Sequence, residues 1–576
     1  MAERVLAGLP ASPGEALGQA RLLVVAAAGG PELPPSARPA ALAAARAALI
    51  AAGAEFGALA ARLRAAGRAA DAEIVDTGVL MAADPALDAA LEAAVLGAGR
   101  PPAAALMDAC GLHADAIGAL EDPTLAARAD DVRSLGRRAA RRLGVEEAPA
   151  LAAAAPPAGS ILVADDLGPA DVAELDDSVA GIALAAGGPS AHAAVVARGL
   201  GLPMVVGLGA ELLSVGAGTS LALDGDAGTV AVAPSAARAG AARGAQARRR
   251  RLRLADEAAA TLPAVTLDGR GVHVLVNAAT AAEVEAGLRM GAEGVGLLRT
   301  ELAFLDAADW PGEPAHRAAL APVLAPLHGR IATVRVLDFG ADKTPRFLRG
   351  TRARGLALLL EHPARLEAQL RAILAAGAAS QLRILLPLVD APEQVEAVRD
   401  VLRRIGGEAT PLGAMIETRA AVGAAGRIAA AADFLSIGTN DLTADVLGAD
   451  RFASGDAATH DPRVLAAIAA TTAAARAAGR VVEVCGEAAS EPLMIPLLVG
   501  LAVDELSVGA ARVAPTRAAV RALDAAAAGR TARAALGDRA AAAVAARAGL
   551  LVREAGDAAP ERLDGERPVV ALGEQS

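Results

Sequence analysis

The sequence is poor in several side chains that carry specific chemistry. Its 576 residues include two cysteines, one tryptophan and no tyrosine. Two cysteines, Cys110 and Cys485, give no disulfide framework and fit a reducing compartment. Lysine occurs once, at Lys343, although lysine and arginine together number 55. A Walker-type phosphate loop places its lysine after a glycine-rich turn, whereas Lys343 follows Asp342, so this class of nucleotide site is excluded.

The rarity of lysine and asparagine makes the surviving copies informative. Alanine is in large excess, a bias typical of GC-rich codon usage, in which arginine replaces lysine wherever either will serve. Lys343 ends the segment DFGADK and Asn440 lies in SIGTNDLT, each in a polar cluster after an apolar run. Chance survival is the alternative, but these positions argue against it. We therefore treat both residues as candidates for function.

Charge and hydropathy argue against two classes of partner. The formal net charge of -11 does not fit a nucleic-acid-binding surface. Residues 178–197 form an uncharged run of membrane-spanning length, but Gly187, Gly188, Pro189 and His192 interrupt it. We interpret this run as a strand, a loop and the start of a helix, and we predict no membrane insertion. The N-terminus has no basic-then-apolar signal pattern, so we expect a cytoplasmic protein.

A chain of this length is expected to form several domains, each with its own core. In the part of the chain before about residue 235, short apolar runs alternate with helical pieces. A long stretch of helical periodicity interrupts them. The arginine-rich run near residue 250 is typical of a solvated linker helix rather than a binding patch. The predicted domains are an α/β domain at 1–36 and 148–234, a helical insert at 37–147, a linker helix at 235–261, a barrel at 262–550 and a tail at 551–576.

Eight apolar, strand-like runs, most of them separated by helical stretches, predict a (β/α)₈ barrel in the second half of the chain. The runs are 273–277, 295–299, 333–338, 383–389, 412–417, 434–438, 481–485 and 505–509. Polar residues follow at their C-terminal ends, which is the rim where such barrels place their chemistry. These residues are Asn277, Arg299, Glu301, Arg335, Asp338, Glu417, Asn440, Asp441, Cys485 and Glu487.

The segment GGPSAHAAVVARGLGLPMVVG, residues 187–207, places His192 after two glycines and at the start of a helical stretch. Glycines before a helix let backbone N–H groups approach an anion, and the helix dipole favours negative charge there. A histidine at that place can act as a nucleophile toward phosphorus. A lone histidine beside a glycine turn is more often structural, and this segment alone does not decide between the two.

The predicted rim suits a phosphate-bearing anion and a divalent metal. Glu417 and Asp441 are hard oxygen ligands that fit Mg²⁺, which takes the rest of its shell from water and substrate. The alternative is that each carboxylate pairs with an arginine. Cys485 either donates a proton there or is a small buried hydrophobe, the more common role of a strand cysteine. Several cations lie near these motifs and favour the binding of a multiply charged anion. They are Arg299, Arg335, Lys343, Arg354 and Arg451.

The motifs GVGLLRTE, VRVLDFGADK, GAMIET, SIGTNDLT, ADR and CGE follow one another in this order, after GLPASPG, ADDVRSLGRR and GGPSAH. This set resembles the enzyme I family of the sugar phosphotransferase system, over nearly the whole chain to about residue 525. The resemblance implies an α/β multidomain fold: a swivelling α/β phosphohistidine domain with a helical insert that docks the phosphocarrier HPr, then a phosphoenolpyruvate-binding (β/α)₈ barrel. It also implies a homodimer formed through the barrel.

The resemblance further implies that His192 takes the phosphoryl group of phosphoenolpyruvate and passes it to HPr, with release of pyruvate. Cys485 would protonate the enolate carbon, and Glu417 and Asp441 would bind Mg²⁺. The residues implied to contact substrate are Arg299, Arg335, Lys343, Arg354, Asn440, Asp441 and Arg451. The sequence departs from the family pattern at Ala191, Ala357, Ala444 and Asp445.

Two other readings of the motifs remain. A phosphoenolpyruvate synthase or pyruvate phosphate dikinase shares the swivelling domain and the barrel, but it needs a large nucleotide-binding domain, and the insert of about 110 residues is too small for one. A non-catalytic regulatory relative that binds phosphoenolpyruvate or HPr is the second reading. Ala191 and Ala357 leave it open. The residues whose joint presence argues against it are His192, Lys343, Glu417, Asn440, Asp441 and Cys485.

Overall fold

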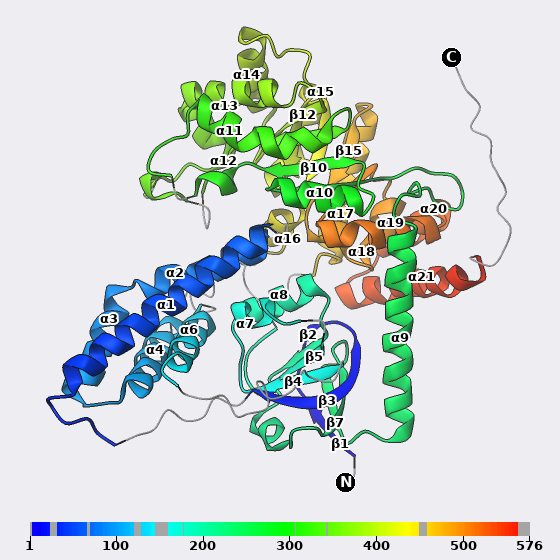
Figure 1. The fold of residues 1–576 in the computed structure, drawn as a ribbon. Helices are drawn as coiled ribbons and strands as arrows, with labels where there is room; N and C mark the ends of the chain where they lie inside the picture. Colours follow the sequence, from blue (N-terminus) through cyan, green and yellow to red (C-terminus); the bar gives the residue numbers. More distant parts are fainter. Residues whose placement is uncertain are drawn as a thin grey trace. The chain divides into compact units, whose positions relative to one another are not determined.

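The computed structural model describes residues 3–23, 31–65, 69–119, 128–144, 159–176, 178–189, 191–305, 307–340, 344–348, 350–448 and 458–562. These residues form two compact units that divide between residues 254 and 255 (Figure 1). Each unit has its own hydrophobic core, and each is described by itself below.

The first unit contains an eight-stranded mixed sheet with the order β1-β8-β7-β3-β4-β5-β6-β2. Its middle strands β3, β4, β5 and β6 run parallel, and antiparallel pairs extend the sheet at both sides. The early strand β3 pairs with β4, so the chain returns to this sheet after the helical insert. The strands are β1 Arg4–Ala7, β2 Leu9–Ser12, β3 Glu15–Leu23, β4 Ser160–Ala164, β5 Val179–Leu184, β6 Met204–Val206, β7 Ser220–Asp224 and β8 Thr229–Val232.

A bundle of helices lies between β3 and β4 in the chain (Figure 1). Its longest member, α1, buries a row of apolar side chains that includes Leu42, Leu49 and Phe56, at seven-residue spacing on one face. Asp84 accepts a hydrogen bond from the Ala86 N–H, so this side chain caps α3, and Pro85 starts the helix. The helices of the insert are α1 Arg38–Ala65, α2 Ala69–Ala82, α3 Pro85–Glu92, η1 Ala93–Gly97, α4 Pro102–Gly118 and α6 Ala129–Arg141.

Helix α1 also has the length and apolar composition of a membrane span over Arg38–Leu63. It is the one such helix in the described ranges of the chain. Its buried side chains pack against the other helices of the insert, as expected of a core helix.

The uncharged run 178–197 folds as the sequence predicted. Strand β5 is followed by a loop and then by α8, His192–Leu200. The other helices of this unit are α7 Pro169–Ala173, η2 Ala210–Ser214 and α9 Ala236–Ala258. Helix α9 contains the arginine-rich run before residue 254, and its last four residues belong to the second unit.

The second unit is a closed barrel of eight parallel strands, which confirms the predicted fold class (Figure 1). The strands pair in chain order from β9 to β16, and β16 pairs with β9 to close the barrel. All eight predicted runs form strands, which are β9 His273–Ala278, β10 Gly294–Arg299, β11 Ile331–Arg335, β12 Gln381–Leu386, β13 Leu412–Ile416, β14 Phe434–Ile437, β15 Val481–Val484 and β16 Glu505–Val508.

Helices surround the barrel because each strand presents one apolar face outward, and the helices bury it. They are α10 Ala281–Arg289, α11 Glu313–Leu324, α12 Gly355–Glu361, α13 Pro363–Ala376, α14 Pro392–Arg404, α15 Arg419–Ala431, α16 Thr439–Leu447, α17 Pro462–Ala477, α18 Met494–Gly500, α19 Val513–Ala522, α20 Ala525–Ala535 and α21 Ala541–Arg562. Short 3₁₀ turns are η3 Glu301–Phe304, η4 Ala325–Leu327, η5 Arg346–Leu348, η6 Glu487–Ser490 and η7 Ala510–Arg512.

The last helix differs from the sequence expectation. Helix α21 continues through residue 562, past residue 550 where the sequence indicated the start of a tail. Alanine, leucine and arginine dominate residues 541–553, and their high helix propensity accounts for the extension.

The barrel interior is closely packed at β13 and β14. Gly413 on β13 pairs in register with Phe434 on β14, and a Cβ at Gly413 would overlap the Phe434 ring. Gly413 therefore makes room for an aromatic side chain that carries the Arg383 guanidinium 4.8 Å above its ring.

We expect Gly413→Ala to lower the free energy of unfolding of the barrel by about 1–3 kcal/mol, because the added methyl group overpacks the Phe434 site. Gly423→Ala is the matched control, since Gly423 is exposed on α15 and a Cβ there meets no atom within 4 Å. This control should raise stability by up to about 1 kcal/mol through helix propensity. Differential scanning calorimetry of both variants checks the pair, and equal stability of the two would contradict the packing argument.

Candidate active site

His192 is the first residue of α8, directly after the glycine-rich loop at the end of β5. Gly187 in this loop has φ of 84°, a left-handed conformation that favours glycine. Arg198 fastens the loop from within the helix, because its Nη1 donates to the Pro189 carbonyl at 2.9 Å and to the Ala11 carbonyl at 2.6 Å. The N-cap residue Ala191 provides no side-chain cap. A helix N-terminus of this kind favours a bound anion.

The His192 ring faces a carboxylate from the helical insert. Its Nδ1 lies 3.3 Å from Oδ2 of Asp131 on α6, and the His192 side chain is only 16% exposed. Arg128 lies 3.5 Å from the same Asp131 oxygen. An Nδ1–H tautomer facing this carboxylate leaves Nε2 with the lone pair that a nucleophile needs.

A second acidic side chain lies beside the same loop. Asp166 follows β4, and a Cβ at Gly187 would lie 3.6 Å from its Oδ1. Burial and, after it, the nearby Asp130 raise the pKa of Asp166 to about 7, against the opposing effects of Arg137 and Arg133. The loop that carries His192 is therefore surrounded by carboxylates and arginines from α6.

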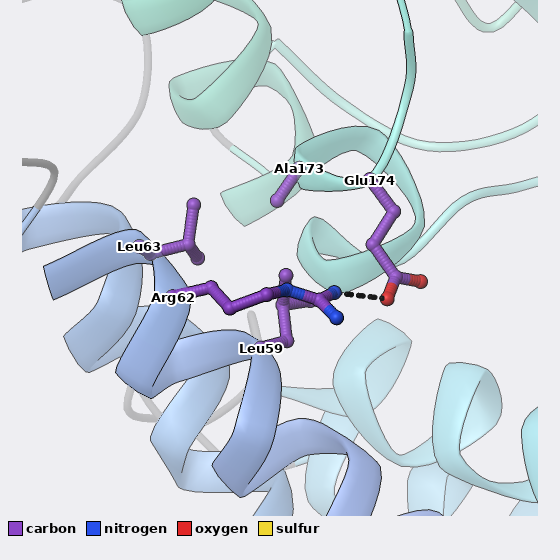
Figure 2. A pocket seen from close by; sticks show the side chains of 5 residues that line it. All are labelled: Leu59, Arg62, Leu63, Ala173 and Glu174. Carbon is purple, nitrogen blue, oxygen red and sulfur yellow. Dashed lines mark hydrogen bonds and ion pairs between the residues drawn. The ribbon is translucent and has the colours of Figure 1, made fainter. Parts of the chain in front are cut away.

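A cavity of about 520 Å³ also lies in the first unit (Figure 2). Leu59, Leu63 and Ala173 form its apolar wall, and Arg62 bonds to Glu174 across it at 3.0 Å. None of the side chains predicted for the functional site lines this cavity, so we do not assign the chemistry to it.

Arg299 and Arg335 end neighbouring strands of the barrel and pair in register, so both reach the same rim. Arg335 is buried, and its Nη2 bonds to Glu301 and lies 3.1 Å from Asp338. Burial disfavours the charged guanidinium, but Asp338, Glu301 and Glu417 outweigh it and raise the pKa of Arg335. Arg299 is half-buried beside it.

Glu417 directly follows β13 and is buried at the centre of the rim. Its Oε1 accepts a hydrogen bond from the Leu388 N–H at 2.7 Å. Burial and, after it, the nearby Asp338 and Asp441 raise its pKa to about 8, against the opposing effect of Arg335. The structure therefore brings Glu417, Asp441 and Arg335 close enough to affect one another electrostatically.

Asn440 and Asp441 lie in the first turn of α16, just after β14. Asn440 Oδ1 accepts a hydrogen bond from the Glu487 N–H at 2.9 Å, which joins this turn to the loop after β15. Gly486 is required where the loop after β15 passes the first turn of α16, because a Cβ on residue 486 would overlap Thr439 and Asn440.

Cys485 follows β15 and is buried among apolar side chains of the barrel. The Ser436 hydroxyl donates to its sulfur at 3.3 Å, and the thiol donates to the Ile437 carbonyl at 3.7 Å. Burial raises the pKa of the thiol to about 12, and Glu483 and Glu417 contribute to the rise. A neutral thiol beside Glu417 and Arg335 is suited to donating a proton, and its burial also fits the small-hydrophobe alternative.

Of the remaining predicted residues, Arg354 is the one that falls within the described ranges. Arg354 is exposed at the start of α12, beside Gly340, whose missing Cβ leaves room for it. Lys343 and Arg451 lie outside the described residues, as does Ser190.

The donor set of the rim determines which metal it could hold. No group of three or more His, Cys, Asp or Glu side chains in the described ranges has the spacing of a complete metal site. Glu417 and Asp441 nevertheless offer carboxylate oxygens beside a third carboxylate, Asp338, and their mutual repulsion is what a divalent cation would relieve. Two protein ligands with the rest of the shell from water and substrate fit Mg²⁺.

Sequence reasoning missed the partner of His192 and the partners of Arg335. Asp131 lies within ADDVRSLGRR, a motif that the sequence singled out, but no local pattern connects it with a residue 61 positions later. Glu301 and Asp338 were recognised as rim residues, and the signal for their pairing is their position just after strands β10 and β11.

We expect both cysteines of the native protein to resist alkylation. Burial raises the pKa of Cys110 and of Cys485 to about 12, so that roughly one thiol in ten thousand is ionised at pH 8. Mass spectrometry after iodoacetamide treatment should find neither labelled until urea unfolds the chain. Cys110→Ser isolates Cys485, and rapid labelling of that variant in its native state would contradict the described burial.

Three family models match the chain: the N-terminal region of PEP-utilising enzymes at residues 7–128, their mobile domain at 156–228 and their PEP-binding domain at 254–525. The chain is 37% identical over 443 residues to a multiphosphoryl transfer protein of Rhodobacter capsulatus, covering 74% of this chain and 53% of that protein. It thus spans about half the length of such multiphosphoryl transfer proteins.

Shorter relatives are covered more fully. The chain is 37% identical over 482 residues to the phosphoenolpyruvate-protein phosphotransferase of Streptomyces coelicolor, covering 80% of this chain and 84% of that protein. It is 36% identical over 421 residues to the phosphoenolpyruvate-protein phosphotransferase of Haloferax volcanii, with coverage of 69% and 73%. By these matches the chain belongs to the phosphoenolpyruvate-protein phosphotransferase family.

Proposed function

We propose that this chain transfers the phosphoryl group of phosphoenolpyruvate to His192 and then to the histidine phosphocarrier HPr, releasing pyruvate, as the first step of a sugar phosphotransferase system. The observation that carries the proposal is the convergence of Arg335, Glu417 and Cys485 at one rim of the barrel. That rim lies within the segment that matches a PEP-binding domain.

The rim residues bind the substrate by charge. Arg299 and Arg335 bind the phosphate oxygens, and Arg335 is held for this role by Glu301 and Asp338. Asn440 and Arg354 contact the rest of the small anion, as do Lys343 and Arg451. Mg²⁺ held by Glu417 and Asp441 supplies further positive charge when it is bound.

Phosphoryl transfer of this kind needs little covalent chemistry beyond positioning and charge neutralisation. Nε2 of His192 attacks the phosphorus in line, and Asp131 orients the ring through Nδ1. Cys485 protonates the enolate carbon to give pyruvate. The mechanism requires His192, in the first unit, to reach the phosphate bound by the second unit, and it therefore requires a swivelling α/β domain.

The remaining proposals follow from the family. HPr docks on the helical insert and receives the phosphoryl group from His192. The chain acts in the cytoplasm as a homodimer formed through the barrel. Multiphosphoryl transfer proteins are among the relatives, which supports a phosphocarrier as the acceptor.

The assignment of His192 is tested with labelled phosphoenolpyruvate and Mg²⁺. His192→Ala should take up no acid-labile phosphate while it stays folded, because the attacking nitrogen is gone. His113→Ala is the control: His113 lies in the same unit, 3.4 Å from Asp84, and its replacement should leave phosphorylation intact. Acid-labile phosphate on the His192→Ala protein would refute the assignment.

The metal site is tested at its two carboxylates. Glu417→Ala and Asp441→Ala should each lower the rate of pyruvate formation by at least about a hundredfold and abolish its dependence on Mg²⁺, because the phosphate then lacks its counter-charge. Asp445→Asn, one turn after Asp441 on α16, should retain the dependence. Wild-type rates of either alanine variant in EDTA would show that these carboxylates bind no catalytic metal.

A further inference from the structure

A polar layer is buried inside the barrel beneath the rim. Ser436, Glu483 and Glu505 are neighbours in register on β14, β15 and β16, and all three side chains are at most 4% exposed. Arg383 reaches this layer from β12 and bonds to Glu505 through two hydrogen bonds of 3.0 Å and 2.9 Å. Its Nε donates to Thr333 at 3.0 Å.

The charges in this layer are unequal. The layer contains two carboxyl groups, Glu483 and Glu505, but only one guanidinium, that of Arg383. Both terminal nitrogens of Arg383 donate to Glu505. Neither oxygen of Glu483 has a hydrogen-bond partner among the described residues. An ionised carboxylate in this position would be a buried charge without a donor, which is strongly unfavourable.

The neighbouring hydroxyl groups show which form of Glu483 fits. Ser436 and Ser507 are the hydroxyls that face its carboxyl group. Ser436 gives its hydrogen to the Cys485 sulfur at 3.3 Å, and Ser507 gives its hydrogen to Asn277 Oδ1 at 2.7 Å. Both hydroxyls therefore present only lone pairs to Glu483. A protonated carboxyl group can donate to them, whereas a carboxylate cannot.

The net electrostatics of the layer favour the same form. Burial and, after it, the nearby Glu505 raise the pKa of Glu483 to about 8, against the opposing effect of Arg383 and the smaller opposing effects of Ser507 and Ser436. A neutral carboxylic acid kept inside a protein at neutral pH can donate a hydrogen bond or a proton.

We infer that Glu483 is a protonated acid that returns a proton to Cys485 through the Ser436 hydroxyl. In this relay Glu483 would donate to Ser436 Oγ, its neighbour in register on β14, and Ser436 donates to the Cys485 sulfur at 3.3 Å. Glu483 does not touch the substrate and acts through these two residues. The inference rests on the proposed function, because it takes Cys485 as the group that protonates the enolate.

The proton transfer balances in two steps. Cys485 gives its proton to the enolate carbon, forming a C–H bond and leaving a thiolate. Ser436 then passes its hydrogen to the sulfur while it takes the Glu483 proton, so the negative charge moves to the Glu483 carboxylate. Water supplies a proton to Glu483 after pyruvate has left, and the net consumption is one proton for each pyruvate formed.

The protonation state is tested first, by infrared spectroscopy at neutral pH. Wild type should show the carbonyl stretch of a buried protonated Glu483, and Glu483→Gln should lose this component of the carboxylic-acid band, while the components of other protonated carboxyl groups remain. Glutamine is a neutral replacement of nearly the same shape, so the variant should melt close to wild type. A wild-type spectrum without this component would overturn the inference.

The relay is tested by isotope exchange without any phosphate acceptor. The protein is incubated in D₂O with Mg²⁺, phosphoenolpyruvate and carbon-labelled pyruvate, and mass spectrometry measures two quantities in the phosphoenolpyruvate. Carbon label reports reversible phosphoryl transfer, and deuterium at C3 reports exchange of the Cys485 proton with solvent. Their ratio isolates reprotonation, which a merely structural role of Glu483 would not change.

Glu483→Gln and Ser436→Ala should both lower the ratio of deuterium to carbon label by roughly tenfold or more, because the route to Cys485 is cut. Ser507→Ala is the matched control: this hydroxyl faces the same carboxyl group but does not contact the Cys485 sulfur, so the ratio should stay at the wild-type value. An unchanged ratio in both Glu483→Gln and Ser436→Ala would overturn the relay.

The Cys485→Ala variant distinguishes failure of the relay from failure of the proposed function on which the relay rests. Loss of carbon exchange in Cys485→Ala supports the proton-donor role. Full carbon exchange in that variant would overturn both that role and the relay, while the infrared band would still report whether Glu483 is protonated.

Discussion

Arg335 is buried at the barrel rim among carboxylates, and the electrostatics of the rim depend on it. It bonds to Glu301, lies 3.1 Å from Asp338 and opposes the shift in the pKa of Glu417. Removing one partner of such a buried pair typically costs about 3–5 kcal/mol, because the remaining charge is left without compensation. Under the proposed function the same guanidinium also binds the anionic substrate, so that the charge of the site and the stability of the fold would depend on one residue.

The barrel was predictable because its signal is local. Each strand of a parallel barrel is buried on both faces and appears in the sequence as a short apolar run, and helical stretches separate most of the runs. The ends of the strands were less well predicted. Strand β11 ends at Arg335, although residues 336 and 337 remain buried, and its last hydrogen bond to β12 is the one that the Val336 N–H donates to the Leu385 carbonyl at 3.0 Å. Hydropathy records burial and does not record hydrogen bonding to a neighbouring strand.

The site was predictable where residues follow strands, and unpredictable where contact depends on distant elements. Glu417 and Cys485 come directly after a strand and Asn440 comes three residues after one, so a barrel brings them to one rim. The approach of Asp131 to His192 depends on how the helical insert packs against the α/β domain, which no local pattern encodes. Glu483 lies inside an apolar run, and only the register of β14, β15 and β16 shows that it faces a serine and a second carboxyl group.

The pairing of β16 with β9 has a consequence for how the chain folds. Glu505 is paired with His273, so the barrel closes between segments more than 200 residues apart in the chain. Contacts at such separation must overcome the loop-closure entropy of the intervening chain, and they form slowly. During synthesis one edge of the first barrel strand remains unpaired until the eighth strand has left the ribosome. An unpaired strand edge is prone to aggregation. The barrel is therefore the part of the molecule whose folding depends most on protection of its nascent chain.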